Sequence, residues 1–287
     1  MNVATATCRT CGSTETSNQG ALPDVDVFAG RRLEAALPGG YLHRCRACGF
    51  VFRAPVLTGA AYNALYAGGG AEVWEQNHDR EDFRLVRAAL ANTPLDVLDV
   101  GCYSGDLLAS LPAGGRRDGV EPGPAAAAMA TARGVEVVAQ SWDQLDGGTR
   151  LYDVVVSCDV IEHVPDPLAF LRSLGRRLKP DGRLIVTTGN SQAWPWRLAR
   201  SRFWYCYFPE HISFIDPLWL RRMAPAAGLR VQRLDPFAHS PLPGLAARAR
   251  ALLATCAWLV ARPRSGHAKL LGGGIARDHM FCILAKD

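Results

Sequence analysis

The most constraining part of this sequence is residues 97–108, which join an apolar run to a glycine-bounded turn. The run carries one acid, Asp99, breaks at Gly101 and Gly105, and resumes with the apolar spacing of a helix. This order is typical of a buried strand that leads through a tight loop into a helix. Glycine lets such a loop approach a ligand closely, and the free amides of a helix start favour polar or anionic groups.

A second acid, Glu121, ends the next apolar segment about twenty residues further along the chain. An acid at the end of the second strand of such a unit usually binds ribose hydroxyls. The loop lacks the Gly-x-Gly-x-x-Gly pattern of dinucleotide sites. We therefore expect a cofactor that contains a nucleoside but is not a dinucleotide.

The spacing of the first acid and the two glycines resembles the first motif of class I S-adenosylmethionine-dependent methyltransferases. The resemblance continues in order through Glu121, residues 152–167 and residues 178–187. One departure is Tyr103, which stands where the family often has a glycine. The resemblance implies that S-adenosyl-L-methionine is the cofactor.

The family resemblance also implies where each part of the cofactor lies. The methionine end belongs near Asp99 and Gly101, with Asp159 beside it, and the ribose belongs on Glu121. The adenine is expected just after the third strand. The implied cofactor-binding residues are Asp99, Gly101, Cys102, Tyr103, Gly105, Glu121, Ser141, Trp142 and Asp159.

Four of the nine cysteines form two Cys-x-x-Cys-Gly units near the start of the chain. Two such units supply four thiolates to a tetrahedral zinc ion, which then has a structural role because no position stays open for water. A thioredoxin-like redox pair is the alternative, but these units precede any βαβ pattern. Residues 42–55 also resemble the zinc-binding front module of bacterial methyltransferases that act on sugars and secondary metabolites. The expected zinc ligands are Cys8, Cys11, Cys45 and Cys48.

Strand-like and helix-like segments alternate through the rest of the chain, which indicates a parallel sheet with helices on both faces. The fold class is therefore α/β: a Rossmann-like, seven-stranded methyltransferase sheet preceded by a small zinc-ribbon module. In the family that this chain resembles, the last strand runs antiparallel. Strands are expected near residues 95–100, 117–121, 135–139, 151–158, 183–188, 230–234 and 280–285.

Three regions are expected along the chain. Residues 1–57 form the zinc-ribbon module, residues 58–94 a helical linker and cofactor-site lid, and residues 95–287 the methyltransferase domain. Two insertions, near residues 193–215 and 241–270, are rich in aromatic or apolar residues flanked by arginines and are interpreted as acceptor lids. The alternative is that the aromatic side chains of the first insertion cap the core.

Two histidines are candidates for the base that accepts a proton from the methylated group. His163 follows the fourth strand, although it could instead serve as scaffolding at a helix start. Glu210 and His211 resemble a Glu-His pair of zinc-bearing sugar C-methyltransferases. That family has a tyrosine where this chain has Phe208. The candidate catalytic residues are therefore His211, His163 and Glu210.

The composition is that of a globular protein, with 48% hydrophobic and 21% charged residues and a net charge of +5. Such a small positive excess does not favour nucleic acid as a partner. Residues 251–261, the longest apolar run, are too short to cross a bilayer. We expect a cytoplasmic location, with peripheral membrane contact as an option because basic, Trp-bearing segments are present.

The expected function is transfer of a methyl group to a hydroxyl of a small molecule: a sugar, a glycan or a secondary metabolite, glycosylated or nucleotide-linked. One alternative is C-methylation of a nucleotide-linked keto sugar. A second alternative is methylation of an RNA base. A third is a binding module without catalysis, which the intact cofactor motifs disfavour. No pattern predicts the oligomeric state.

Overall fold

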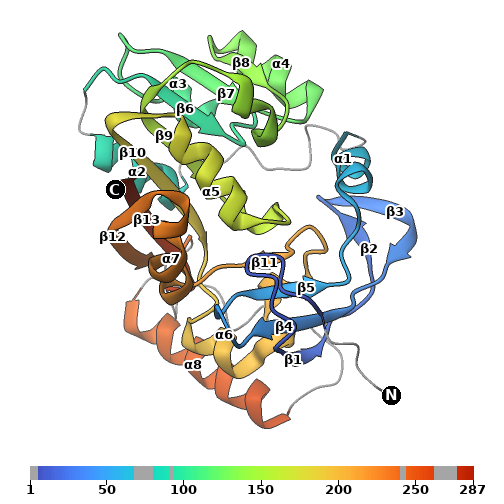
Figure 1. Cartoon of the computed structure of the whole chain (residues 1–287). Coiled ribbons are helices and arrows are strands. Elements are labelled where there is room, and N and C mark those ends of the chain that lie inside the picture. Colours follow the sequence, from blue (N-terminus) through green and yellow to red (C-terminus); the bar gives the residue numbers. More distant parts are fainter. Residues whose placement is uncertain (1–5, 68–79, 91–92, 240–243, 262–276) are drawn as a thin grey trace.

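The computed structural model describes residues 6–67, 80–90, 93–239, 244–261 and 277–287. A seven-stranded sheet with the order β12-β13-β10-β9-β6-β7-β8 forms the centre of the larger part (Figure 1). β8, β7, β6, β9 and β10 are parallel, and β13 is antiparallel to both of its neighbours, β10 and β12, so the predicted fold class is confirmed. The strands are β6 (Val97–Val100), β7 (Arg117–Val120), β8 (Glu136–Ala139), β9 (Tyr152–Cys158), β10 (Leu178–Gly189), β12 (Leu229–Phe237) and β13 (His279–Lys286).

Helices on both faces of this sheet explain why its central strands are almost continuously apolar. On β9, Val154 belongs to the core of one face and Val155 to the core of the other. Leu184 and Ile185 of β10 divide in the same way. The surrounding helices are α2 (Glu81–Leu90), α3 (Asp106–Ala109), α4 (Pro124–Ala132), η1 (Trp142–Gly147), η2 (Ile161–His163), α5 (Pro167–Arg176), α7 (Pro217–Met223) and η5 (Ala224–Ala227).

The N-terminal part contains a four-stranded antiparallel sheet with the order β1-β4-β5-β11. Its fourth strand, β11 (Ser213–Phe214), comes from a distant part of the chain and joins the module to the region after β10. Whether residues 1–57 form a separate module stays a prediction. The other elements here are β1 (Thr16–Ala21), β2 (Val25–Phe28), β3 (Arg31–Leu37), β4 (Tyr41–Cys45), β5 (Val51–Ala54) and α1 (Gly59–Ala67).

The first predicted lid contains α6 (Trp194–Ala199), η3 (Arg200–Arg202) and η4 (Trp204–Tyr207). Trp196, Phe203 and Tyr205 are buried and pack with Leu42 and Phe214 of the N-terminal sheet. Much of the aromatic cluster therefore fills the interior between the two sheets. A lid role for this segment stays a prediction.

Only part of the second predicted lid belongs to the described residues, because residues 241–243 and 262–270 lie outside them. Its described part includes α8 (Gly244–Ala261), on which Leu245, Leu252 and Leu253 are exposed. Among the described helices, none combines the length and the apolar character needed to span a bilayer. Peripheral membrane contact stays a prediction.

Candidate functional site

The four N-terminal cysteines meet at one point, as the two Cys-x-x-Cys-Gly units predict. The sulfurs of Cys8 and Cys48 are 3.6 Å apart, and those of Cys11 and Cys45 are also 3.6 Å apart. A tetrahedron with zinc–sulfur bonds of 2.3 Å has edges of about 3.8 Å, so the cluster fits a zinc ion. The glycine after each unit has a positive φ, which lets its amide turn back to the carbonyl of the first cysteine.

The first cysteine unit also supports the rest of the site through Arg9, which lies between its two cysteines. The Arg9 guanidinium donates to the carbonyl oxygens of Pro165, Arg53 and Ile212, each at 2.8 Å. These three carbonyls belong to the loop before α5, to β5 and to the residue before β11. A metal that fixes the cysteine unit therefore also fixes the chain next to His211.

The glycine loop after β6 has the conformation that its sequence predicts. Gly101 and Gly105 have φ values of +83° and +78°, a region in which side chains are strained. A Cβ on Gly101 would lie 2.4 Å from Cγ2 of Val160, so only glycine fits there. Tyr103, which departs from the family pattern, adopts the same left-handed region with φ of +47°. The loop thus keeps its shape without the usual third glycine.

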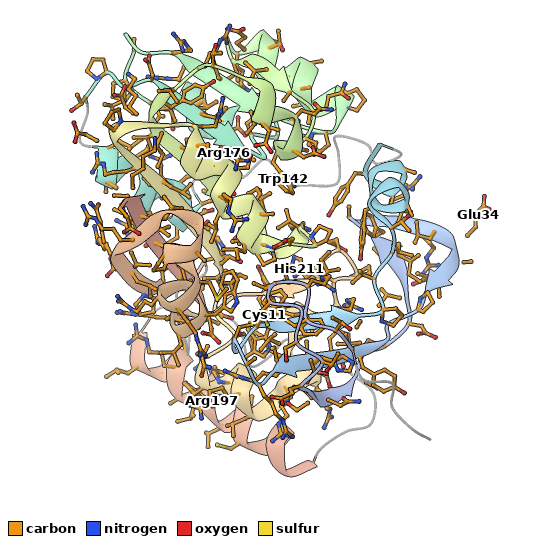
Figure 2. All side chains as sticks on the ribbon, in the orientation of Figure 1. Cys11, Glu34, Trp142, Arg176, Arg197 and His211 are labelled. Atoms are coloured by element: carbon orange, nitrogen blue, oxygen red, sulfur yellow. The ribbon has the colours of Figure 1, made fainter. Side chains whose placement is uncertain are left out.

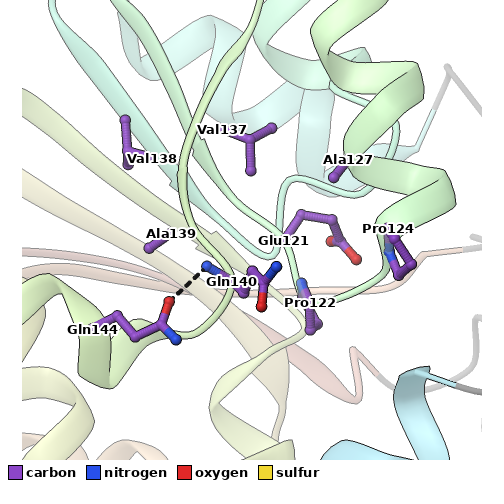
Figure 3. Close-up of a pocket in the computed structure, with 9 residues that line it drawn as sticks. All are labelled: Glu121, Pro122, Pro124, Ala127, Val137, Val138, Ala139, Gln140 and Gln144. Atoms are coloured by element: carbon purple, nitrogen blue, oxygen red, sulfur yellow. Dashed lines mark hydrogen bonds between the residues drawn. The ribbon is translucent and has the colours of Figure 1, made fainter.

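Glu121 holds this loop in place. Its carboxylate accepts hydrogen bonds from the backbone N–H groups of Tyr103 at 3.0 Å and Gly123 at 2.8 Å. Burial raises the pKa of Glu121, although both amides counteract that effect. The carboxyl group also lines a pocket of ≈ 300 Å³ (Figure 3). The pocket is lined by Glu121, Pro122, Pro124, Ala127, Val137, Val138, Ala139, Gln140 and Gln144.

The residues expected near the adenine are not the residues that line the pocket beside Glu121. Ser141 and Trp142 are not among the lining residues of the pocket, whereas Gln140 and Gln144 are. The Trp142 ring, labelled in Figure 2, packs edge-on against Phe170, with ring centroids 5.5 Å apart. Sequence reasoning found the correct strand end but missed the two glutamines, because period and spacing do not reveal which side chains face the pocket.

Cys102 is another expected cofactor residue, and its side chain points into the core. Its sulfur packs so closely against β7 that a Cβ on Gly119 would lie 2.5 Å from it. The Cys102 thiol is buried, and its amide donates to the carbonyl of Val120. Cys102 therefore shapes the loop from below.

Acidic side chains gather at the carboxyl ends of β6 and β9. Asp99 is buried, and this burial raises its pKa to about 7, with a further contribution from nearby Asp82. Arg80 makes two hydrogen bonds to Asp82, at 3.0 and 2.6 Å, and one to Asp159, at 2.5 Å. Sequence reasoning missed Arg80 and Asp82, which precede the first motif and carry no spacing signal.

The two candidate histidines are neighbours. The rings of His163 and His211 are 4.9 Å apart and nearly perpendicular (Figure 2 labels His211). Nδ1 of His211 lies 2.9 Å from the carbonyl oxygen of Tyr205. Because a carbonyl only accepts, Nδ1 carries the proton and Nε2 keeps a free lone pair. Nδ1 of His163 lies 2.9 Å from the hydroxyl of Tyr66.

Both imidazoles are neutral at physiological pH. Burial lowers the pKa of His163 to about 4, and burial together with His163 lowers the pKa of His211 well below its usual value. A neutral imidazole with a free nitrogen can accept a proton from a bound hydroxyl.

Glu162 is the acid that lies with these histidines. Its carboxyl group accepts hydrogen bonds from the hydroxyls of Tyr205 and Thr188, and burial raises its pKa to about 8. Glu210, the acid expected to act with His211, is also buried, and its pKa is raised to about 7. Among the described residues, Oε2 of the Glu210 side chain has no hydrogen-bond partner, whereas the backbone of Glu210 hydrogen-bonds to His163. A catalytic role for Glu210 stays a prediction.

Comparisons with known proteins agree with this architecture. A family described as a methyltransferase domain matches residues 73–234. The ubiquinone biosynthesis O-methyltransferase of Aeromonas salmonicida is 31% identical over 160 residues, which cover 51% of this chain and 67% of the relative. The enzyme of the same name from Azorhizobium caulinodans is 31% identical over 181 residues, which cover 58% and 69%.

Two solved structures share the fold. One is a chain from the complex between the Haloferax volcanii Trm112 methyltransferase activator and a methyltransferase. It has a TM-score of 0.53 and 18% identity, over 78% of this chain and 97% of that one. The other is the YcgJ protein from Bacillus subtilis, with a TM-score of 0.50 and 14% identity, over 72% and 98%.

The curated relatives correct the expected function. The prediction of a sugar, glycan or secondary-metabolite acceptor, with C-methylation of a keto sugar or RNA methylation as alternatives, is wrong. The matched relatives are named ubiquinone biosynthesis O-methyltransferases. The cysteine units and the Glu-His pair occur in sugar enzymes, but they form a metal cluster and the base region and do not determine which acceptor is methylated. What the motifs, the fold and the relatives agree on is the family: this chain is a class I S-adenosylmethionine-dependent methyltransferase.

Proposed function

We propose that this enzyme transfers the methyl group of S-adenosylmethionine to a hydroxyl oxygen on an aromatic ring. Its curated relatives are named O-methyltransferases at about 30% identity. The observation that carries the proposal is the imidazole of His211, which a backbone carbonyl holds with its basic nitrogen free.

The cofactor binds along the carboxyl ends of β6, β7 and β8. The Glu121 carboxylate has about four acceptor positions, of which two backbone amides occupy two, so the remaining positions suit two ribose hydroxyls. The adjoining pocket, with apolar walls at Val137 and Ala127 and amides at Gln140 and Gln144, accepts a base. Asp99 pairs with the cofactor's ammonium group. The cofactor supplies a methyl group on a positively charged sulfur.

His211 takes the proton that the acceptor loses. The acceptor oxygen forms its bond to the methyl carbon while the sulfur–carbon bond breaks, and that electron pair stays on sulfur. The hydroxyl proton passes to Nε2 of His211 and then to solvent. Aligned reactants gain roughly 7–11 kcal/mol from positioning, and a base adds about 10²–10⁴-fold.

The acceptor class follows from the acidity that these histidines require. Because burial lowers the pKa of both imidazoles, they are weak bases that need a comparatively acidic hydroxyl. A phenol, with a pKa of about 10, is such a group, whereas a sugar hydroxyl is a far weaker acid. Aromatic rings also surround the histidines: Tyr66, Tyr205 and the exposed Phe208. These rings suit a planar acceptor.

The cysteine cluster holds a structural zinc ion. Four thiolates leave no open coordination position, so the metal takes no part in the chemistry. Its contribution is to fix Arg9, which donates to the carbonyl of Ile212 beside the base.

The test is a methyl-transfer assay with labelled S-adenosylmethionine and two sets of acceptors. One set is a catechol with and without an alkyl chain, and the other is a nucleotide-linked sugar of similar size. We expect a labelled methyl ether on the catechol and none on the sugar, identified by mass spectrometry and by the position of the methyl signal in NMR spectra. Methylation of the sugar alone, or of a carbon or nitrogen atom, would contradict the proposal.

A further inference from the structure

A second pair of histidines lies at the same edge of the sheet, outside the base cluster. His279 begins β13 and pairs in register with Gly189 at the end of β10 and with Phe237 at the end of β12. His239 follows two residues after β12, and Asp159 follows β9. Because β13 is antiparallel to β10, its first residue lies at the carboxyl edge where the parallel strands end. Three distant segments thus place a carboxylate and two imidazoles together.

The donor atoms of these three residues lie within 4.8 Å of one another. Nε2 of His239 is 3.3 Å from Oδ2 of Asp159. The rings of His239 and His279 are 4.4 Å apart at an angle of 74°. Two imidazoles and one carboxylate are a common donor set for a divalent transition metal.

One of the two histidines is also supported by a second carboxylate, as metal-binding histidines usually are. Nδ1 of His279 lies 3.0 Å from Oδ1 of the buried Asp278, so its Nε2 is the nitrogen left for a ligand. The buried Asp82 lies near the other ring, with its Oδ1 3.8 Å from Nδ1 of His239, which is too long for a hydrogen bond.

Asp159 has one carboxylate oxygen without a hydrogen-bond partner among the described residues and a strained backbone conformation. Its Oδ2 is bound by Arg80, but its Oδ1 is buried and has no hydrogen-bond partner among the described residues. Its backbone is left-handed, with φ of +53°, which is costly for a residue with a side chain. A buried carboxylate oxygen without a donor is unfavourable, and a metal ion would remove that cost.

We propose that Asp159, His239 and His279 form a second metal site, which binds a divalent transition-metal ion with open positions for the acceptor. The Tyr205 ring lies 5.6 Å from the His279 ring and 4.1 Å from the His211 ring, so the site is one aromatic ring away from the base. The metal polarises the acceptor hydroxyl and lowers its pKa, which makes proton loss to a weak imidazole base feasible. This second role rests on the proposed function, whereas the metal site itself does not.

The charges around the site favour a cation. Arg80 is the cation that contacts Asp159, while Asp82 and Asp278 add negative charge next to the two histidines.

The test is a Co²⁺ titration at pH 7.5 of enzyme that carries one equivalent of zinc per chain, followed by visible absorption and by equilibrium dialysis. One equivalent of zinc fills the four-thiolate cluster and leaves the second site empty, so Co²⁺ reports that site through d–d bands without a thiolate charge-transfer band. We expect one Co²⁺ per chain, and at least tenfold weaker binding in His239→Gln and His279→Gln. His163→Gln, a nearby histidine outside the three, is the matched control and should bind Co²⁺ as the wild type does. Circular dichroism checks that each variant is folded.

Two results would overturn the site: no Co²⁺ bound beyond the cysteine cluster, or equal binding by His239→Gln and the wild type. The role in catalysis is read separately, from the rate of methyl transfer to a catechol. We expect His279→Gln to lower the rate and to shift the pH profile upward, because the acceptor hydroxyl is no longer acidified. An unchanged rate and profile would overturn the role. Co²⁺ binding without catechol methylation by the wild type would instead count against the proposed function.

Discussion

The two ends of the catalytic sheet edge stabilise their buried acids in different ways. At the β7–β8 end, Glu121 is held by backbone amides 2 and 18 residues away. At the β9–β13 end, Asp159 is held by Arg80, 79 residues away, and Glu162 by Tyr205, 43 residues away. The first end is built by a local loop. The second end depends on tertiary packing between segments that are far apart in the sequence.

The N-terminal module supports only the second of these ends directly. Arg9 donates to the carbonyl of Ile212, and the buried Arg53 donates to the carbonyls of His211, Cys206 and Phe208. None of the residues that line the pocket at Glu121 belongs to the described part of the module. Cofactor affinity and turnover should therefore respond to different substitutions.

The largest expected effect is that of His211→Asn on turnover. The asparagine amide can still donate to the Tyr205 carbonyl, but it has no basic nitrogen in place of Nε2. We expect kcat to fall by about 10²–10⁴-fold, with the Kd for S-adenosylmethionine unchanged. Single-turnover kinetics and calorimetry measure the two quantities. Equal turnover in variant and wild type would remove His211 as the base.

Glu121→Ala should instead weaken the binding of S-adenosylmethionine. Two ribose hydroxyls lose their acceptor and two loop amides lose theirs, so we expect a loss of about 1.5–3 kcal/mol, or roughly 10- to 150-fold in Kd. Glu121→Gln keeps one acceptor oxygen, so its Kd for S-adenosylmethionine should lie between those of the alanine variant and the wild type. Calorimetry that finds wild-type affinity in the alanine variant would disprove the position of the ribose.

The pH dependence of cofactor affinity should report Asp99. Burial raises the pKa of this acid to about 7, so below that pH it is protonated and cannot pair with the cofactor's ammonium group. Affinity should therefore rise with pH by up to about tenfold per unit below pH 7 and level off above it. Titrations at pH 5.5–8.5 measure this slope. Asp99→Asn should abolish the slope, and an equal slope in that variant would assign it to another group.

The smallest effect expected on catalysis is that of Cys11→Ser, which leaves three thiolates. The variant should lose most of its zinc, melt at a lower temperature and turn over several times more slowly, because Arg9 is less firmly held. The Kd for S-adenosylmethionine should not change. Metal analysis, calorimetry and steady-state kinetics provide the readouts. A variant with full zinc content would contradict the zinc site. A variant with weakened cofactor affinity and normal turnover would contradict the proposed difference between the two ends of the sheet edge.

Much of the local part of this architecture could be predicted from the sequence. The strand–loop–helix unit at Gly101 and Gly105 and the pairing of four cysteines follow from short spacings with a direct physical cause. The sheet follows from alternating periodicity. The rest depends on long-range packing: no spacing brings Arg80 to Asp159, or His239 to His279, because sheet order alone makes them neighbours.

The surroundings of Glu162 likewise depend on long-range packing that sequence spacing does not predict. The sequence pairs Glu210 with His211 because the two resemble a Glu-His pair of zinc-bearing sugar C-methyltransferases. In the structure, Nδ1 of His211 is held by the carbonyl of Tyr205, and the acid near both histidines is Glu162. Adjacent residues in an extended segment point in different directions, whereas residues from facing segments can meet.

The most direct test of this account is a calorimetric titration of S-adenosylmethionine into three proteins: the wild type, Glu121→Ala and His211→Asn. The account predicts one site per chain in the wild type, clearly weaker binding in Glu121→Ala and wild-type binding in His211→Asn. A wild-type protein that does not bind the cofactor, or a His211→Asn variant that loses affinity as Glu121→Ala does, would contradict it.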